Sequence, residues 1–176
     1  MKSARLLVAL ALGAVPLAGC GLQPMYAGGG NGAVARGLAG IQVSAIEGRG
    51  GWLVRNALND QLANRSSGAP RYRLDVRLDD QLEAYALLSD DTVGRERRTL
   101  RARYQLVDIA SGATVIDATA GSDAGIDVVS SDYATIAAEQ TALENLAKVV
   151  ADRIVANVAL QLRKNEGLPA ADAGAR

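Results

Sequence analysis

Arginine side chains provide most of the potential chemistry of this chain, which has 16 arginines and 3 lysines. Two segments carry them at alternating positions: Arg73 and Arg77 in the first, and Arg95 and Arg97 in the second, where Arg98 follows directly. A guanidinium group is planar, stays protonated and donates two parallel hydrogen bonds to a phosphate. Alternate residues of a strand lie about 7 Å apart on one face. The pattern therefore predicts a surface that binds several phosphates of one ligand.

A solvated, charge-paired sheet face is the alternative interpretation of these arginines. Five acidic residues share the predicted face or its continuation: Asp75, Asp79, Glu83, Asp117 and Asp123. Cross-strand charge pairs on a wet surface would explain the same composition without any ligand. Arg95, Arg97 and Arg98 begin a predicted strand beside a loop and have only Glu96 among them, which favours ligand binding there. A regular pleat would point Arg98 to the opposite face.

The residue types that most catalytic sites need are missing from the sequence. It has no histidine, the commonest general base and metal ligand, and Cys20 is its only cysteine. No glycines follow a predicted strand with the G-x-G-x-x-G spacing of nucleotide sites. We therefore expect no enzymatic activity, no metal and no cofactor. A carboxylate-dependent periplasmic glycan hydrolase is the remote alternative.

Residues 1–19 have the parts of a secretory signal peptide. Lys2 and Arg5 precede ten consecutive apolar residues, 6–15, and Leu17-Ala18-Gly19-Cys20 follows. Ten helical residues span about 15 Å, half of a hydrocarbon core, so no permanent transmembrane helix is expected. The four residues resemble the lipobox of bacterial lipoproteins. This resemblance implies cleavage before Cys20, a diacylglycerol on its sulfur and an N-acyl chain, hence a membrane anchor. An exported protein with an unmodified Cys20 is the alternative.

The chain that begins at Cys20 is close to neutral. The full sequence has 19 basic and 19 acidic residues, and removal of Lys2 and Arg5 leaves 17 against 19. A general electrostatic attraction to nucleic acid is therefore not expected. Recognition of an anion must come from local clusters of basic side chains.

Three parts follow the signal peptide in this interpretation: a lipidated segment with a Gly-rich tether over 20–40, a folded domain over 41–166 and a disordered tail over 167–176. Six glycines in 27–40 indicate the tether. Alternating and helical spacings of apolar residues predict the elements of the domain. These are a strand over 41–46, a glycine turn over 48–51, a helix over 52–64, strands over 72–84, 95–109 and 114–124, and a helix from about 133 to 166.

This order predicts an α+β fold, β-α-β-β-β-α, in which two helices pack on one face of a four-stranded mixed sheet as a two-layer sandwich. The first strand is expected to be parallel to 72–84 through a right-handed crossover, and the others form an antiparallel meander. Trp52 is predicted to pack into the core at the start of its helix, with an interface anchor as the alternative. The outer sheet face carries the arginines.

Cys20–Tyr26, with the sequence CGLQPMY, resembles the start of mature proteins of the LptE family of lipopolysaccharide-assembly lipoproteins. The order of elements is also similar, and Leu22 replaces a frequent phenylalanine without losing its apolar role. The resemblance implies an outer-membrane lipoprotein at the periplasmic face that plugs an LptD-type barrel, aids its assembly and binds lipopolysaccharide during insertion into the outer leaflet. Arg95, Arg97 and Arg98 match the family's basic ligand contacts in kind and location. An accessory lipoprotein of another outer-membrane assembly machine is the alternative.

Overall fold

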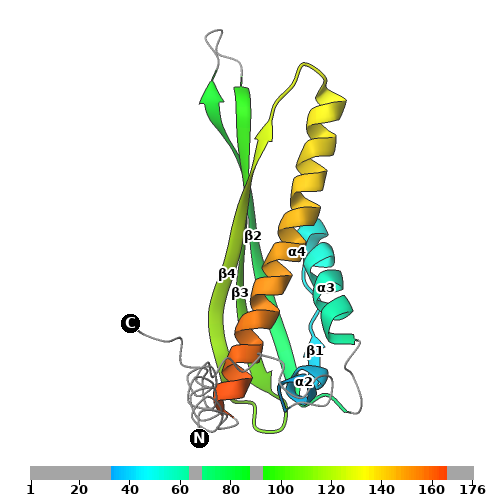
Figure 1. Ribbon diagram of the computed structural model, residues 1–176, viewed down its shortest axis with the longest axis vertical. Coiled ribbons are helices and arrows are strands. Elements are labelled where there is room, and N and C mark those ends of the chain that lie inside the picture. Colours follow the sequence, from blue (N-terminus) through cyan, green and yellow to red (C-terminus); the bar gives the residue numbers. More distant parts are fainter. Residues whose placement is uncertain (1–32, 64–68, 88–92, 166–176) are drawn as a thin grey trace, which may run out of the picture.

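Three stretches of the chain, residues 33–63, 69–87 and 93–165, are described by the structure, which is a computed structural model. The predictions for the signal peptide, for Cys20 and for the tail over 167–176 lie outside these residues. The elements occur in the following order (Figure 1): α2 (Ala33–Ala39), β1 (Ile41–Val43), α3 (Gly48–Ala63), β2 (Tyr72–Leu87), β3 (Val93–Asp108), β4 (Thr114–Asp127) and α4 (Asp132–Asn165).

The sheet has the strand order β1-β2-β3-β4. β1 is parallel to β2 and pairs Ile41 with Tyr72, whereas β2, β3 and β4 form an antiparallel meander. The predicted α+β sandwich and its mixed sheet are therefore confirmed. All strands of the meander are long, and Figure 1 shows them as a tall, twisted ribbon with α4 along one face. Two ends can be distinguished: a β1 end, where α2 also lies, and a distal end, where the β2–β3 hairpin and the start of α4 lie.

The core lies between the sheet and the two longer helices. Alternation in β2 and β3 buries Leu74, Leu100 and Tyr104 on the face toward the helices, and α3 contributes Leu58. α4 places its predicted apolar stripe on the sheet: Leu143, Leu146, Val150, Ile154, Val158 and Leu162 are all buried. Each buried side chain of this size stabilises the fold by about 1.5–3 kcal/mol. The interior stripe of α4 therefore fixes which sheet face remains in solvent.

Two segments that the sequence analysis left without regular structure are helical. Residues 33–39 of the predicted tether form α2, because Ala35 and Leu38 recur at helical spacing and are buried. α3 begins at Gly48, so the predicted glycine turn is the first turn of a helix. Gly51 permits this packing, since a Cβ there would lie 2.6 Å from the carbonyl oxygen of Ile46.

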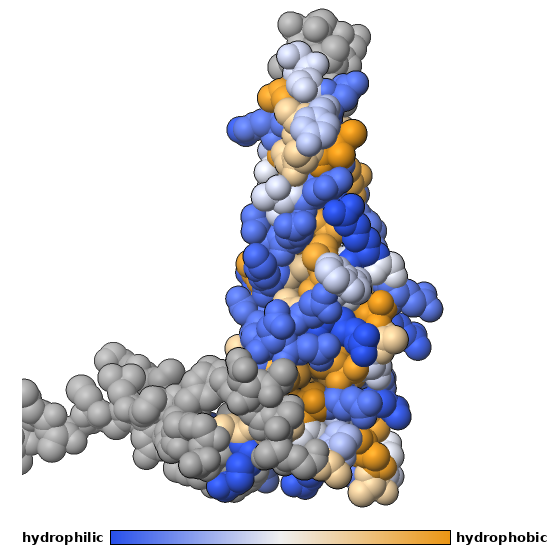
Figure 2. All heavy atoms as spheres, turned by 90° about the vertical axis from the view of Figure 1, so that its right-hand side faces the viewer, coloured by the Kyte–Doolittle hydropathy of each residue, from blue (hydrophilic) through white to orange (hydrophobic). Residues whose placement is uncertain are grey.

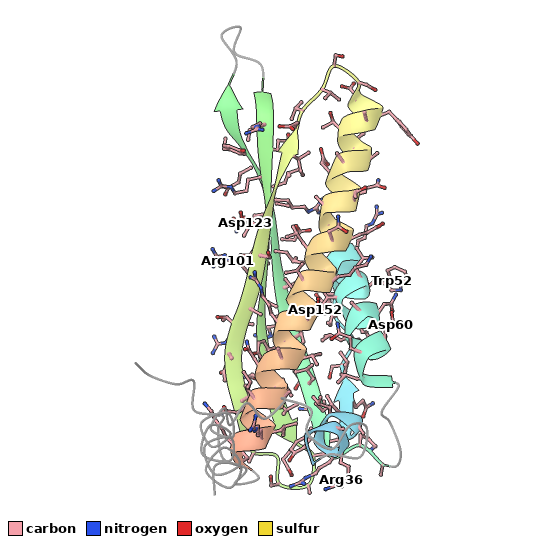
Figure 3. The ribbon with its side chains drawn as sticks, viewed as in Figure 1. Arg36, Trp52, Asp60, Arg101, Asp123 and Asp152 are labelled. Atoms are coloured by element: carbon pink, nitrogen blue, oxygen red, sulfur yellow. The ribbon has the colours of Figure 1, made fainter. Side chains whose placement is uncertain are left out.

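Trp52 corrects another prediction. Its side chain is 62% exposed and points away from the sheet (Figure 3), because the residues of α3 that meet the core are Val54, Leu58 and Leu62. Figure 2 shows the helix side of the molecule, where hydrophobic and hydrophilic residues are mixed on the surface. In the described part of the chain, no helix is long and apolar enough to cross a membrane.

The distal end of the sheet is covered more thinly than the β1 end. α3 starts near Asp80, whose carboxylate lies 3.8 Å from the Cβ position of Gly50, and runs toward the β1 end. Beyond that level only α4 lies over the sheet. Leu82, which the alternation of β2 places on the same face as Leu74 and Leu78, is consequently 42% exposed.

Candidate functional site

The arginines of the outer sheet face form separate groups along its length. Arg73 lies near the β1 end, Arg77 in the middle, and Arg95 and Arg97 at the distal end. Arg97 pairs with Glu83, ten residues from Arg73 on β2, so these two arginines are about 33 Å apart at 3.3 Å per residue. One phosphorylated headgroup cannot contact all the predicted residues together.

The middle group combines residues from three strands. Arg77 lies directly opposite Arg103, and Arg101 follows on the same face. Arg103 donates to Asp117 from Nε at 3.2 Å and from Nη2 at 3.0 Å, which raises the pKa of Arg103 and lowers that of Asp117. The guanidinium group of Arg103 is thus already occupied by a carboxylate. Figure 3 shows Arg101 and Asp123 on the side of the sheet away from the helices.

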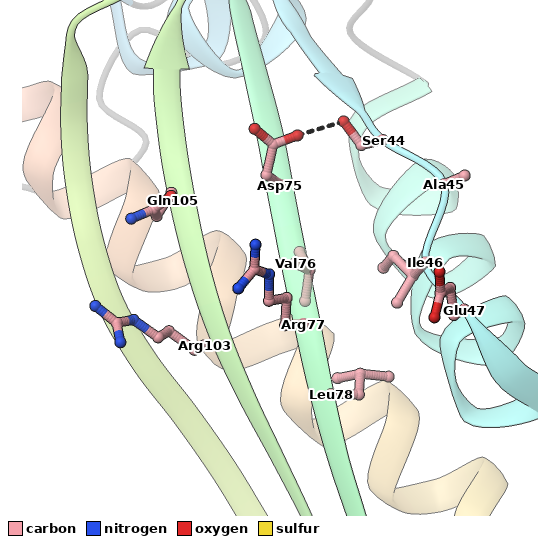
Figure 4. A pocket seen from close by; sticks show the side chains of 10 residues that line it. All are labelled: Ser44, Ala45, Ile46, Glu47, Asp75, Val76, Arg77, Leu78, Arg103 and Gln105. Carbon is pink, nitrogen blue, oxygen red and sulfur yellow. Dashed lines mark hydrogen bonds between the residues drawn. The ribbon is translucent and has the colours of Figure 1, made fainter.

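Arg73 is also engaged with a neighbouring carboxylate. Its Nε lies 3.0 Å from Oδ2 of Asp75, and the hydroxyl of Ser44 donates to Oδ1 of Asp75 at 2.6 Å (Figure 4). Burial of Asp75 opposes ionisation, but these hydrogen bonds outweigh it and lower the pKa of the carboxyl. This part of the face matches the charge-paired interpretation.

The distal group contains an aromatic residue from the segment between the predicted strands 72–84 and 95–109. Tyr85 lies in β2, and the guanidinium carbon of Arg97 is 5.0 Å from the centroid of its ring. Arg95 donates to Asp127 at 2.7 Å, and Asp127 followed by Tyr85 raises the pKa of Arg95. Gly125, opposite Arg97, leaves room for the phenol, whose hydroxyl is 3.7 Å from the glycine's Cβ position. Continuing the strand period past Ala84 would have placed Tyr85 on the arginine face.

Arg98 lies on the other face, as the pleat predicted. Its Nε and Nη2 donate to the two oxygens of Asp80 at 2.9 and 2.7 Å, and Nη1 donates to the carbonyl of Glu139 at 3.2 Å. The structure therefore does not bring Arg98 together with Arg95 and Arg97. Its contacts join β3, β2 and α4.

Exposed apolar residues surround the distal end and were not identified from the sequence. Tyr85 is 48% exposed, and Val129, Tyr133 and Ile136, at the β4–α4 junction, are 49%, 84% and 50% exposed. The backbone N–H of Val128 donates to the carbonyl of Gly94 at 3.1 Å, which holds this junction beside the start of β3. A guanidinium group next to exposed apolar side chains suits a ligand that is both anionic and apolar.

No cluster of three metal-ligating residues occurs in the described stretches of the chain. Arg95 and Arg98 form ion pairs with Asp127 and Asp80, and no acid of the distal end forms a confined carboxylate pair with another in the hydrogen bonds and ion pairs described above. The arrangement therefore provides contacts for binding.

Comparison with known proteins identifies relatives of this fold. A family model described as LptE, lipopolysaccharide-assembly, matches residues 38–158. A lipoprotein structure from Caulobacter crescentus CB15 is 31% identical, with a TM-score of 0.64 over 79% of this chain and 100% of that one. Rare lipoprotein B from Shewanella oneidensis is 15% identical, with a TM-score of 0.52 over 72% of this chain and 96% of that one. Lipoprotein B from Nitrosomonas europaea is 13% identical, with a TM-score of 0.55 over 73% and 83%. A search of curated protein sequences gave no match.

Proposed function

This chain belongs to the LptE family of lipopolysaccharide-assembly lipoproteins, and we propose that it plugs an LptD-type outer-membrane barrel. In this proposal it aids assembly of the barrel and binds lipopolysaccharide during insertion into the outer leaflet. Diacylglycerol and an N-acyl chain on Cys20 hold it at the periplasmic face of the outer membrane. The family is non-enzymatic and is not known to need a cofactor.

The distal end of the sheet is the observation that supports lipopolysaccharide binding. Lipopolysaccharide combines phosphate groups with acyl chains, so its binding site needs cations beside apolar surface. Arg97 stacks on Tyr85 and keeps its guanidinium edge accessible, while Arg95 is more than half exposed beside Asp127. Val129, Tyr133 and Ile136 supply apolar surface at the same end.

The predicted ligand residues take different roles in this proposal. Arg95 and Arg97 contact phosphate at the distal end. Arg73 and Arg77 form a second contact area nearer the β1 end, where a sugar-linked phosphate of an extended ligand would reach them. Arg98 positions β3, since Asp80 and Glu139 already accept its hydrogen bonds.

Tagging the full-length lipoprotein at its C-terminus and purifying it from detergent-extracted membranes tests the barrel assignment. We expect an LptD-type barrel to be retained in stoichiometric amount. Replacement of Cys20 by serine should reduce its yield, because the protein is no longer held at the membrane. Retention of a different barrel would indicate that the protein is a subunit of another outer-membrane assembly machine. Retention of no barrel would contradict the proposed plugging.

Binding of purified lipopolysaccharide tests the distal site. The double variant Arg95→Asp/Arg97→Asp should weaken binding at least tenfold, because two phosphate contacts become repulsive. The matched control, Arg49→Asp/Arg55→Asp, makes the same charge change on exposed positions of α3 and should bind as the unsubstituted protein does. Equal losses in the two variants would indicate nonspecific attraction and remove the distal arginines from the site.

A further inference from the structure

The edge of β2 is unpaired over most of its length. β1 pairs with β2 only from Tyr72 to Leu74, although β2 continues to Leu87. The chain leaves the sheet after Val43, and among the described residues its last backbone hydrogen bond to β2 there runs from the N–H of Ser44 to the carbonyl of Leu74 at 3.0 Å. Within the described residues, no other strand lies beside β2 on this side.

Hydrogen-bond directions identify which backbone groups face this edge. Tyr72 donates its N–H to Gly40 and Leu74 accepts from Ser44, so even-numbered residues of β2 direct their backbone groups away from β3. The alternation of an antiparallel pair continues this pattern to Val76, Leu78, Asp80 and Leu82. The register shift begins only after Ala84. β2 therefore presents a row of unpaired donors and acceptors over about four two-residue repeats.

The opposite edge of the sheet is protected in the middle. Nη1 of Arg153 in α4 donates to the carbonyl of Gly121 in β4, which points away from β3. A charged side chain on an edge strand blocks the approach of another strand. Among the described residues, β2 has no corresponding arginine on its edge-facing carbonyls. The two edges of one sheet thus differ in how they are covered.

A groove of about 800 Å³ borders the start of the free edge. The loop residues Ser44–Glu47 form one wall and Asp75–Leu78 form the other (Figure 4). Figure 4 shows Ile46 and Leu78 on either side of the gap. Apolar side chains are thus available on the helix side of the edge, and Leu82 extends them toward the distal end.

We propose that the β2 edge accepts one extended segment of the barrel partner, which adds a strand beside Val76–Leu82. The segment carries apolar side chains toward Leu78 and Leu82 and basic side chains toward Asp79 and Glu83, which have no arginine ion pair among the described contacts. Strand addition of this kind takes its affinity from backbone hydrogen bonds and its specificity from alternate side chains. This inference rests on the proposed function, because it assigns the segment to the barrel.

A second copy of this chain fits the edge poorly. In an antiparallel pairing centred on Leu78, residue 82 of one copy would face residue 74 of the other, where β1 already lies. A strand from a different protein does not meet this obstacle.

Amide hydrogen exchange on the full-length lipoprotein, free and in the purified barrel complex, tests the edge directly. The amides of Val76, Leu78, Asp80 and Leu82 should exchange at least tenfold more slowly in the complex. The edge-facing amides of Thr119 and Asp123 in β4 serve as the internal control and should change less. A complex in which the β2 amides exchange as in the free protein overturns the inference but leaves plugging intact. Failure to obtain any barrel complex contradicts the proposed function itself.

Substitutions separate backbone pairing from side-chain packing. Leu82→Pro removes an edge-facing N–H and should reduce the retained barrel at least tenfold, whereas Leu82→Ala keeps the N–H and should reduce it less. Asp123→Pro places the same change on the β4 edge and should retain the barrel. If a folded Leu82→Pro variant retains the barrel as the unsubstituted protein does, the inference is overturned. It is also overturned if a cross-linker placed at residue 81 of this protein reaches only a second copy of the chain and not the barrel. If Leu82→Pro does not fold, amide hydrogen exchange on the unsubstituted protein decides whether the β2 edge pairs with the barrel.

Discussion

Arg98 and Asp80 form a two-pronged ion pair on the helix side of the sheet, with Nε 2.9 Å from Oδ1 and Nη2 2.7 Å from Oδ2. The pair connects β3 with β2, and Nη1 of Arg98 extends the contact to the Glu139 carbonyl in α4. The hydrogen bonds that Arg98 donates to Asp80 raise the pKa of Arg98. One side chain therefore joins three elements at the level where α3 begins, beyond which apolar packing toward the distal end becomes sparse.

Replacing Arg98 by alanine should lower the free energy of unfolding by about 1–3 kcal/mol, because the partly shielded Asp80 carboxylate loses its partner. The side chains of Arg98 and Asp80 are only 16% and 28% exposed, so water replaces the lost contacts incompletely. Urea unfolding followed by circular dichroism measures the change. Arg98→Lys keeps the charge and should lose less, and Arg101→Ala on the outer face should lose little. A loss for Arg98→Ala no larger than for Arg101→Ala would contradict this role.

Gly51→Ala should destabilise the protein by about 1–3 kcal/mol through overpacking. A Cβ at this position would lie 2.6 Å from the Ile46 carbonyl oxygen and 2.8 Å from Cγ2 of Ile46, so the loop after β1 would have to move. Thermal and urea unfolding measure this loss. Gly50→Ala is the matched control in the same helix, since its nearest neighbour is a Leu143 methyl at 3.6 Å. That control should be neutral or stabilising, because alanine is the better helix former by about 1 kcal/mol. Equal effects of the two substitutions would refute the close contact.

The sequence was sufficient to predict the layers but not the two ends of the molecule. Periodicity identified the α4 stripe and the strand meander, because a residue that must be buried recurs with the period of its element. Periodicity could not identify α2 or the first turn of α3. In that turn a glycine is needed because the backbone lies close to Ile46, and in the sequence this glycine looks like a turn signal. Periodicity also could not show that Trp52 and Leu82 are exposed, since this depends on where α3 begins over the sheet.

The candidate site was predictable as a set of arginines but not as a geometry. Alternation placed Arg95 and Arg97 on one face and Arg98 on the other, and the structure agrees. The separation of Arg73 from Arg97 follows from the length of β2, which exceeds the predicted strand by three residues at its distal end. The same extension brings Tyr85 beneath Arg97.

Asp108→Asn should reduce stability at pH 7, and this difference should shrink as the pH falls from about 4 to 2. The N–H and hydroxyl of Ser111 donate to the Asp108 carboxylate at 3.0 Å each, and the N–H of Ala110 donates at 3.1 Å. These hydrogen bonds lower the pKa of Asp108 below that of the unfolded chain. Ionised Asp108 therefore stabilises the fold above the unfolded-state pKa, and this contribution is lost as pH falls through the folded pKa.

Urea unfolding of both proteins between pH 2 and 7 measures this dependence. Asp123→Asn, at an exposed position of β4, provides the matched control, in which an aspartate outside the Asp108 hydrogen-bond network is replaced. A constant difference between Asp108→Asn and the unsubstituted protein across this range would show that the carboxylate is not the stabilising group.

Tyr104→Phe should leave stability at pH 7 within about 1 kcal/mol of the unsubstituted protein, and should make it relatively more stable above pH 10. The Tyr104 ring is fully buried, and its hydroxyl has no hydrogen-bond partner of normal geometry among the described residues. Burial raises the pKa of the phenol, and the nearby Asn157 side chain offsets this only in part. Above pH 10 the unfolded chain loses the phenolic proton while the native state keeps it, so the free energy of unfolding falls with rising pH. Phenylalanine abolishes this loss. Urea unfolding at pH 7 and near pH 11 measures the difference, and Tyr133→Phe, at a position 84% exposed, is the matched control for removal of a phenol hydroxyl. A parallel pH dependence for Tyr104→Phe and the unsubstituted protein would show that the phenol ionises equally in the native and unfolded states.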